Sequence, residues 1–323
     1  MSISPNGINI DEVLEELASY TIWYPAYEEA MRLVTKSIGS TRDRKDPSSA
    51  MLIGPTGVGK TRLCLKLEKQ LGPIQKVIRA DCVKTIRPCV YVELPESATI
   101  KSLSKVMAEI LGGNFSDYQS ITVLETFIIE RLITMEVKLV ILDDFHHVAE
   151  KGLSKTKSSL CKWIIKLLNK SGIPFLISGS PTAEATINTV QELSDRFPYR
   201  ARLQWLPLAE EAAIPALLGV LAALQQEMIR LGCLTDYIHL TDPNPYKAIY
   251  LATQGNFRRL SNLLHDSFRI ALLRGDYSLT INDFAEAADD LVFCSSPNHF
   301  RMTPKELNSK LKAQPNKVLV PKK

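Results

Sequence analysis

The chain has 323 residues, of which 45% are hydrophobic and 23% are charged, so it is long enough to bury one large core or two modest ones. No apolar run approaches the ~20 residues that span a bilayer, and the acidic, amphipathic N-terminus does not resemble an export signal, so we expect a cytoplasmic protein without a membrane partner. The net charge is +4, but residues 295–323 alone contribute +6, so any nucleic-acid surface on the rest of the chain must be a local patch.

The first two thirds of the chain alternate between helical and strand patterns. Helices are predicted over residues 11–18 and 25–37, the second beginning at Pro25, and a polar loop follows over 39–49. Strands are then predicted at 50–54, 89–94, 138–144, 174–180 and 200–206, and helices at 60–71, 101–111, 120–134, 155–170 and 182–195. Continuous apolar strands that alternate with helices are typical of a parallel sheet covered on both faces.

From residue 208 to about 290 every periodic segment has helical spacing. Helices are predicted at 209–231, 245–253, 257–274 and 280–291. The remaining residues are polar and basic, so we expect a flexible tail. The sequence therefore predicts an N-terminal helical extension, an α/β domain, a C-terminal all-α domain and a tail, at 1–48, 49–206, 207–294 and 295–323.

The six cysteines lack CxxC spacing, which favours reduced thiols over a disulfide framework. Cys82 and Cys89 lie close enough to suggest half of a metal site, but no second Cys/His pair follows. We therefore expect both to be buried strand residues.

The segment GPTGVGKT at residues 54–61 fits the pattern G-x-x-x-x-G-K-[ST] between a predicted strand and a predicted helix. Its glycines let backbone N–H groups surround a phosphate, and the following helix adds its positive end. Lys60 would reach the β- and γ-phosphates of ATP, and the Thr61 hydroxyl would bind Mg²⁺. The predicted nucleotide-binding residues are Gly54, Pro55, Thr56, Gly57, Val58, Gly59, Lys60, Thr61 and Arg62.

The strand KLVILDD ends in two carboxylates at the sheet edge where the phosphate site is expected. Asp143 is placed to hold Mg²⁺, and Asp144 could accept a proton from the attacking water. The alternative is that both residues begin a surface turn. His146 and His147 follow directly, and we assign no metal to them because loop histidines are more often polar orienters or surface residues.

Three further positions carry polar groups suited to nucleotide hydrolysis. Ser180, with Ser178 as second choice, could orient water or touch the γ-phosphate, although Ser180 could equally cap the next helix. Arg196 and Arg200 precede the last strand and could act on the γ-phosphate of a neighbouring subunit, or form structural salt bridges. Arg258 begins a helix of the all-α segment and could reach the nucleotide, or lie on a solvated helix start.

Together these motifs resemble the AAA+ ATPases over roughly residues 20–291. The segments IWYPAYEEAMRLV, DDFHHV, SGSPTAEA and QGNFRRLSNLL resemble the TniB/TnsC group, ATP-dependent regulators of Tn7-like and CRISPR-associated transposons. The resemblance implies an α/β P-loop core with a C-terminal helical lid, and a sensor 1, an arginine finger and a sensor 2 near Ser180, Arg196–Arg200 and Arg258. It also implies ATP and Mg²⁺ as cofactors, rings or filaments on duplex DNA, and a transposase and a TniQ-like target-selection protein as partners.

One departure from that group concerns hydrolysis. The group carries Asp-Glu at the end of this strand, whereas this chain has Asp143-Asp144. The shorter carboxylate lies about one C–C bond further from the water, so we expect a slow ATPase whose rate rises on Asp144→Glu.

Two lysine-containing segments are candidates for contacts with DNA phosphates. Residues 97–105 place Thr99, Lys101 and Lys105 at a helix start, and residues 150–159 include Lys151. Each segment could equally be a solvated helix face.

Other functions share part of this pattern. A helicase-loader or origin-recognition-like AAA+ protein would have the same ATP motifs, usually with a winged-helix module. A STAND-type ATP-binding scaffold would add long repeats, and a nucleotide kinase would need an acceptor site that the all-α segment does not display. The predicted function is an ATP-switched, DNA-binding regulator of transposition.

Overall fold

A computed structural model of the chain describes residues 5, 7, 9–78, 83–95, 99–147, 154–208, 216–294 and 297–313, without the side chains of 154–156. The chain forms two compact units, an α/β unit of Pro25–Gln204 and a helical unit of Met1–Tyr24 with Trp205–Lys323. None of the helices in these described ranges is long and apolar enough to cross a membrane.

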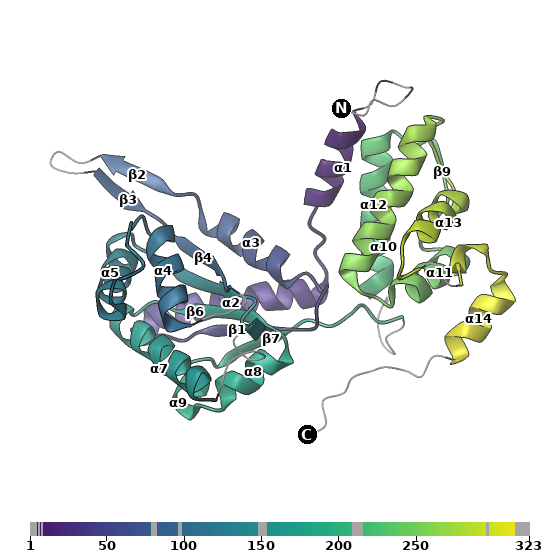
Figure 1. The fold of residues 1–323 in the computed structure, drawn as a ribbon. Coiled ribbons are helices and arrows are strands. Elements are labelled where there is room, and N and C mark those ends of the chain that lie inside the picture. Colours follow the sequence, from purple (N-terminus) through teal and green to yellow (C-terminus); the bar gives the residue numbers. More distant parts are fainter. Residues whose placement is uncertain are drawn as a thin grey trace. The chain divides into compact units, whose positions relative to one another are not determined.

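The α/β unit is built on a parallel sheet of five strands, which confirms the sequence prediction (Figure 1). In spatial order the strands are β4 (Cys89–Glu93), β5 (Leu139–Asp143), β6 (Phe175–Gly179), β1 (Ala50–Ile53) and β7 (Tyr199–Arg202). Because all five strands run in the same direction, the residues that follow β1, β5 and β6 meet at one edge of the sheet.

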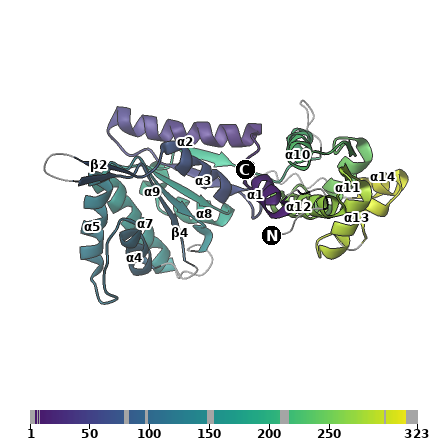
Figure 2. The same cartoon turned by 90° about the horizontal axis from the view of Figure 1, so that it is seen from above.

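Helices cover both faces of this sheet (Figure 2). One face carries α2 (Pro25–Arg44) and α3 (Lys60–Leu71). The other carries α4 (Ile100–Ile110), α5 (Ile121–Thr134), α7 (Ser154–Ser171), α8 (Pro181–Asn188) and α9 (Gln191–Asp195). Side chains alternate across each strand, so Val140 and Leu142 join the core beneath this second set of helices, whereas Ile141 and Asp143 point toward the first.

Two of the predicted helices differ from the observed ones by more than a residue or two at their ends. Helix α2 continues to Arg44 through a stretch predicted as a loop, because Thr41 is buried and its hydroxyl bonds Ser37 O at 2.9 Å and Ser48 N at 2.9 Å. The helix predicted over 182–195 is two helices, since Val190 between them is extended at φ −119°. Polar composition alone did not reveal either arrangement.

A two-stranded antiparallel hairpin, β2 (Gln75–Ile78) with β3 (Val83–Ile86), was not predicted. Its facing residues Ile78 and Val83 are 82% and 62% exposed, so the hairpin lacks the buried apolar face that identifies a strand in a sequence.

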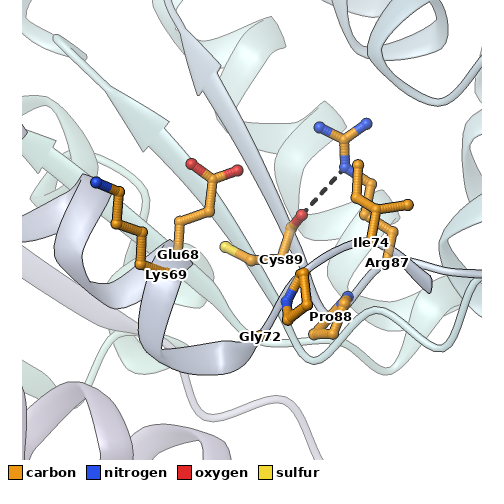
Figure 3. Close-up of a pocket in the computed structure, with 8 residues that line it drawn as sticks. Glu68, Lys69, Gly72, Ile74, Arg87, Pro88 and Cys89 are labelled. Carbon is orange, nitrogen blue, oxygen red and sulfur yellow. Dashed lines mark hydrogen bonds between the residues drawn. The ribbon is translucent and has the colours of Figure 1, made fainter.

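An open pocket of about 310 Å³ lies beside the base of this hairpin (Figure 3). Its lining residues are Glu68, Lys69, Gly72, Pro73, Ile74, Arg87, Pro88 and Cys89. Cys89 begins β4 and is buried as predicted, and burial with the nearby Glu68 carboxylate raises its pKa to about 12. The pocket lies at the amino ends of the strands, opposite the edge where the predicted phosphate site lies, and contains none of its residues. Cys82 lies outside the described residues.

The helical unit centres on α12 (Phe257–Arg274), which packs against α1 (Ile10–Ser19), α11 (Pro243–Thr253) and α13 (Ile281–Asp290). Its other elements are α10 (Ala216–Gly232), β8 (Asp236–Tyr237), β9 (Ser278–Leu279), the 3-10 helix His299–Arg301 and α14 (Pro304–Ala313). α1 lies in this unit and α2 in the other, although the sequence analysis grouped both in one extension.

Part of the expected flexible tail is ordered. Helix α14 buries Leu307, and Phe300 packs against Phe284 with ring centroids 5.6 Å apart. These two apolar residues are isolated in a polar, basic stretch, which is why composition predicted disorder there.

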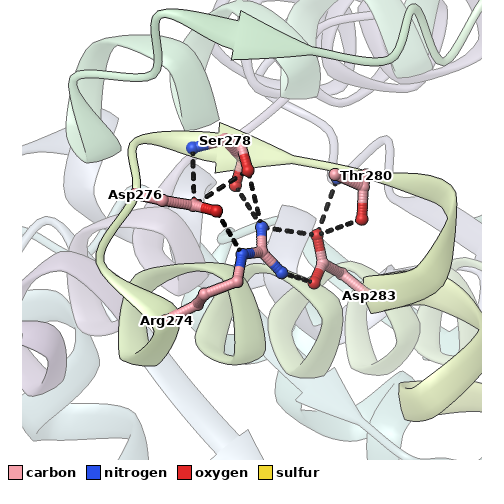
Figure 4. Close-up of polar contacts among 5 residues, drawn as sticks. All are labelled: Arg274, Asp276, Ser278, Thr280 and Asp283. Atoms are coloured by element: carbon pink, nitrogen blue, oxygen red, sulfur yellow. Dashed lines mark hydrogen bonds and ion pairs between the residues drawn. The ribbon is translucent and has the colours of Figure 1, made fainter.

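A polar network joins the end of α12 to the start of α13 (Figure 4). Arg274 bonds Asp276, Ser278 and the buried Asp283, and Asp283 Oδ2 accepts hydrogen bonds from the Thr280 N–H at 2.6 Å and hydroxyl at 3.0 Å. The aspartate thus caps α13 and fixes the turn that leads into it.

Candidate functional site

The loop after β1 has the backbone that a phosphate cradle requires. Gly54 N donates to Gly179 O at 3.1 Å, which ties the loop to the end of β6. A Cβ on Gly54 would lie 2.5 Å from Leu203 O, and one on Gly59 would lie 1.9 Å from the Tyr27 hydroxyl. Gly59 also has φ +89°, a conformation that side chains disfavour. The loop therefore fits only with glycine at these positions, and it leads directly into α3.

Lys60 is folded back over this loop. Its ammonium donates to Gly54 O at 2.9 Å and to Pro55 O at 3.1 Å, and the residue is 8% exposed. A positive charge held by two neutral carbonyls at a helix N-terminus is arranged to receive an anion. Thr61 follows in the first turn of α3 and is exposed.

Tyr27 of α2 contacts the loop after β1 at Gly59, which the sequence analysis did not predict. Its hydroxyl donates to Gly59 O at 2.7 Å, and burial raises its pKa well above the usual value. The nearby Arg62 charge opposes that rise. Since the phenol stays protonated, Tyr27 remains a hydrogen-bond donor at neutral pH. The only sequence signal was its place in the YPAYEEA segment.

Asp143 ends β5 as predicted and is completely buried. Its Oδ2 accepts a hydrogen bond from the Tyr91 hydroxyl at 3.0 Å, and its Oδ1 accepts one from Asp144 N at 2.9 Å. Burial and the Asp143 charge both raise the Tyr91 pKa, so the phenol stays a donor. The Asp143 carboxylate and the Thr61 hydroxyl are oxygen donors of the kind that Mg²⁺ prefers, so these residues fit that ion.

Asp144 has φ +55°, which is unusual for a residue other than glycine and costs about 1–3 kcal/mol. Its side chain lies opposite His146, with 3.7 Å between Asp144 Oδ1 and His146 Nδ1. The His146 ring in turn packs against His147, with centroids 4.4 Å apart. Strained backbone of this kind is concentrated at functional sites.

Ser178 and Ser180, the two serines predicted to orient water or touch the γ-phosphate, differ in environment. Ser180 lies at the N-cap of α8 but makes no side-chain cap bond; its hydroxyl instead lies 2.6 Å from that of Thr182. Ser178 is completely buried in β6, in register with Leu52 of β1. Ser180 is thus the one closer to the sheet edge.

Arg196 and the start of β7 lie at the amino ends of the strands, whereas the loop after β1 lies at their carboxyl ends. Arg196 O accepts a hydrogen bond from Ser49 N just before β1, and Arg200 is in register with Met51. The Arg196 side chain pairs with Asp46, and that of Arg200 bonds Glu184 at 3.1 Å. The structure therefore does not bring either arginine to the phosphate loop of its own chain.

Arg258 belongs to the helical unit, where Asn256 caps α12 and accepts from Arg258 N at 3.0 Å. Gly255 precedes it with φ +70°, and a Cβ there would lie 1.9 Å from Leu206 O. The Arg258 side chain is exposed, whereas Arg259 lies over the Phe293 ring at 5.6 Å. Contact of Arg258 with a nucleotide stays a prediction.

The residues predicted to contact DNA differ in exposure and in the positive charge that they offer. Thr99 caps α4 through a capping box with Ser102, and Lys101 is exposed in the first turn. Lys105 is paired with Asp117, which raises the Lys105 pKa, and its ammonium also lies 4.0 Å from Glu109. Lys105 therefore offers less positive charge to an outside anion than Lys101 does. Lys151 lies outside the described residues.

The family model described as Bacterial TniB protein matches residues 16–207. No curated protein sequence matches the chain significantly.

Among solved structures, Cdc6p from Pyrobaculum aerophilum is similar with a TM-score of 0.60 and 16% identity, over 88% of this chain and 71% of that one. The Aeropyrum pernix ORC2 protein in its ADPNP–ADP complexes has a TM-score of 0.57 and 15% identity, over 81% and 67% of the two chains. The Aeropyrum pernix ORC1 protein in complex with DNA has a TM-score of 0.56 and 18% identity, over 85% and 67%. At these identities the likeness concerns the fold.

Proposed function

Because this chain belongs to the bacterial TniB family, whose model matches more than half of its residues, we propose that it is an ATP-dependent AAA+ regulator of transposition. In this proposal the ATP-bound protein assembles on duplex DNA as a ring or filament. It links a TniQ-like target-selection protein to the transposase, and ATP hydrolysis resets the assembly. The α/β P-loop fold with its helical C-terminal region is the fold of AAA+ ATPases.

The observation that carries the proposal is the loop around Lys60. Gly54 and Gly59 have no room for side chains, and the Lys60 ammonium rests on two backbone carbonyls that a phosphate could replace. An ORC2 protein of similar fold was solved with ADPNP and ADP, which supports ATP as the ligand.

The surrounding residues suit hydrolysis of that ligand. The loop N–H groups and Lys60 would hold the β- and γ-phosphates, and Thr61 and Asp143 would hold Mg²⁺, which when bound offsets the charge on those phosphates. Asp144 would accept a proton from the attacking water. Because Asp is shorter than Glu, we expect a slow rate, further stimulated by DNA.

The proposed assembly would complete each site with a neighbouring subunit. Arg196 and Arg200 lie at the far edge of the sheet from their own phosphate loop, where they could meet a second copy. A guanidinium supplied in this way would stabilise the charge on the transferring phosphoryl group. DNA would be held through phosphates by the α4 start, chiefly Thr99 and Lys101.

A second candidate function is an origin-recognition-like or helicase-loading ATPase. It is favoured by the similar solved structures, which include the ORC1 protein in complex with DNA. It would share nucleotide binding and DNA binding with the first proposal. The two proposals differ in partner, since only the first requires a transposase.

Electron microscopy tests the proposal directly. The protein would be imaged with duplex DNA and a slowly hydrolysed ATP analogue, beside Lys60→Ala and the control Lys69→Ala, which changes an exposed lysine on the same helix. Rings or filaments should form with the wild type and Lys69→Ala, and be lost with Lys60→Ala. A wild type that binds no ATP would refute the proposal, and failure to recruit the cognate transposase to such assemblies would favour the origin-like alternative.

A further inference from the structure

His146 and Asp144 are brought together by a short turn after β5. The Asp144 carbonyl accepts a hydrogen bond from His147 N at 3.0 Å, and Phe145, which lies between Asp144 and His146 in the sequence, is completely buried. Phe145 N donates to Ser178 O at 2.9 Å, which ties the turn to β6. A Cβ built on Gly179 would lie 3.4 Å from His146 N, so the turn also lies against the end of that strand. The backbone that carries both side chains is therefore well supported.

The two side chains face one another without a hydrogen bond between them. His146 Nδ1 lies 3.7 Å from Asp144 Oδ1, which is longer than a hydrogen bond. Nδ1 is buried and has no hydrogen-bond partner among the described residues. Buried polar atoms without a partner are rare and call for an explanation such as a functional role.

Asp144 has a fixed backbone but a carboxylate that the described residues leave without a hydrogen bond. Its N–H is held by Asp143 Oδ1 at 2.9 Å, whereas its side chain is 30% exposed and has His146 as its only ion-pair neighbour in the described ranges. A general base acts efficiently only when its acceptor oxygen is held toward the proton that it removes. This carboxylate therefore needs a group that orients it.

We propose that His146 is the positioning residue for Asp144 in ATP hydrolysis, an inference that rests on the proposed ATPase function. In the hydrolysing state His146 Nδ1–H donates to Asp144 Oδ1, and the Asp144 Oδ2 faces the attacking water. A shift of about 1 Å closes the observed gap to hydrogen-bond length. The adjacent His147 ring limits where the imidazole can turn.

The reaction at this site is the hydrolysis of the bond to the γ-phosphoryl group. The water oxygen forms a bond to the γ-phosphorus, the bond from that phosphorus to the β–γ bridging oxygen breaks, and ADP leaves with the electron pair. The water proton passes to Asp144 Oδ2. His146 keeps its own proton throughout and orients the carboxylate that receives the other.

Three substitutions separate this role from a structural one. His146→Ala removes the donor; His146→Asn places an amide nitrogen at the position of Nδ1; His146→Gln places one near that of Nε2 instead. We expect His146→Ala and His146→Gln to lower kcat about tenfold or more with KM for ATP unchanged, and His146→Asn to stay within about threefold of wild type. His265→Ala, at a histidine of α12 that the proposal does not involve, is the control and should leave kcat unchanged.

A double-mutant cycle shows whether His146 acts through Asp144. In Asp144→Glu the longer carboxylate reaches the water without help, so adding His146→Ala should cost less than about threefold. An equal loss in both backgrounds would overturn the inference, as would a His146→Ala protein with wild-type kcat or with lost ATP binding. ATP affinity of the wild type is measured separately by titration, and its absence would refute the proposed function itself.

Discussion

The hydroxyl of Tyr91 donates a hydrogen bond to Oδ2 of Asp143 over 3.0 Å, joining β4 to the buried carboxylate that ends β5. Because Asp143 is completely buried, this bond and the one from Asp144 N fix both carboxylate oxygens. Mutation of a group that orients a metal ligand commonly lowers metal affinity or activity about 10–100-fold.

Tyr91→Phe should therefore weaken Mg²⁺ activation. We expect the Mg²⁺ concentration for half-maximal ATPase to rise about tenfold, while ATP binding in EDTA stays unchanged. Magnesium titrations of the ATPase rate measure the effect. Tyr118→Phe, at a residue that is 96% exposed, is the control. A normal Mg²⁺ response in Tyr91→Phe would show that the hydrogen bond is not used.

Asp144→Glu should raise the hydrolysis rate. The added methylene moves the carboxylate about one C–C bond closer to the proposed water position, and we expect kcat to increase about three- to tenfold with little change in KM. Steady-state ATPase assays with duplex DNA measure this. A rate that stays the same or falls would remove side-chain length as the cause of slow turnover.

Arg196 and Arg200 are expected to act on the nucleotide of a neighbouring subunit. Replacement by Ala of the arginine that acts in this way, Arg196 or Arg200, should lower the ATPase rate about 10³-fold or more without affecting ATP binding. Mixing that variant with Lys60→Ala should restore part of the activity, because an intact phosphate loop then meets an intact arginine.

Arg202→Ala is the control for this experiment, since Arg202 also bonds Glu184, at 2.6 Å. Loss of activity in Arg202→Ala equal to that in Arg200→Ala would indicate that the Glu184 ion pairs are structural. Absence of recovery in the mixtures for both Arg196→Ala and Arg200→Ala would contradict action between subunits.

DNA binding should depend on Lys101 more than on Lys105. Lys101 is exposed, whereas Lys105 is already paired with Asp117. We expect Lys101→Ala to weaken binding equally on all sequences and to reduce the slope of log K against log salt by about 1. Asp117→Ala should strengthen binding by freeing Lys105. Fluorescence anisotropy over a salt series measures these slopes, and an unchanged slope in Lys101→Ala would exclude that contact.

The network around Arg274 should contribute to the stability of the helical unit. Asp283→Ala leaves the Arg274 guanidinium without its buried partner and uncaps α13, so we expect a loss of about 2–3 kcal/mol in the free energy of unfolding. Urea denaturation followed by circular dichroism measures the loss. Arg301→Ala, which breaks the exposed pair with Asp289, should cost less than about 1 kcal/mol.

The contribution of this network to stability depends on pH over a defined range. Hydrogen bonds from Arg274 and Ser278 lower the pKa of Asp276 from 3.8 to about 2. When folding lowers the pKa of a carboxyl group, that group stabilises the folded protein fully at pH values above its pKa in the unfolded chain. This stabilisation is lost as the pH falls toward the pKa of the group in the folded protein. The stability difference between wild type and Asp276→Ala should therefore be equal at pH 8 and pH 5, and should shrink between about pH 4 and pH 2.

The sequence by itself determined the parts of the molecule that lie within one continuous segment. The predicted phosphate-binding loop is eight consecutive residues, 54–61, between a strand and a helix, so its pattern is complete in the sequence. The parallel sheet was predictable because each strand is a continuous apolar run that alternates with a helix. Asp143 was predictable because a strand of known direction ends there.

The tertiary structure alone decided which distant residues meet. Tyr27 contacts the loop at Gly59, and Tyr91 bonds Asp143 across 52 positions, yet no periodic pattern in the sequence indicates either contact. Likewise, Asp117 reduces the charge that Lys105 offers only because the chain folds back beyond α4. Hydrogen bonds and ion pairs act over about 3–4 Å, so they depend on packing between elements, and packing of this kind leaves no periodic signal along the chain.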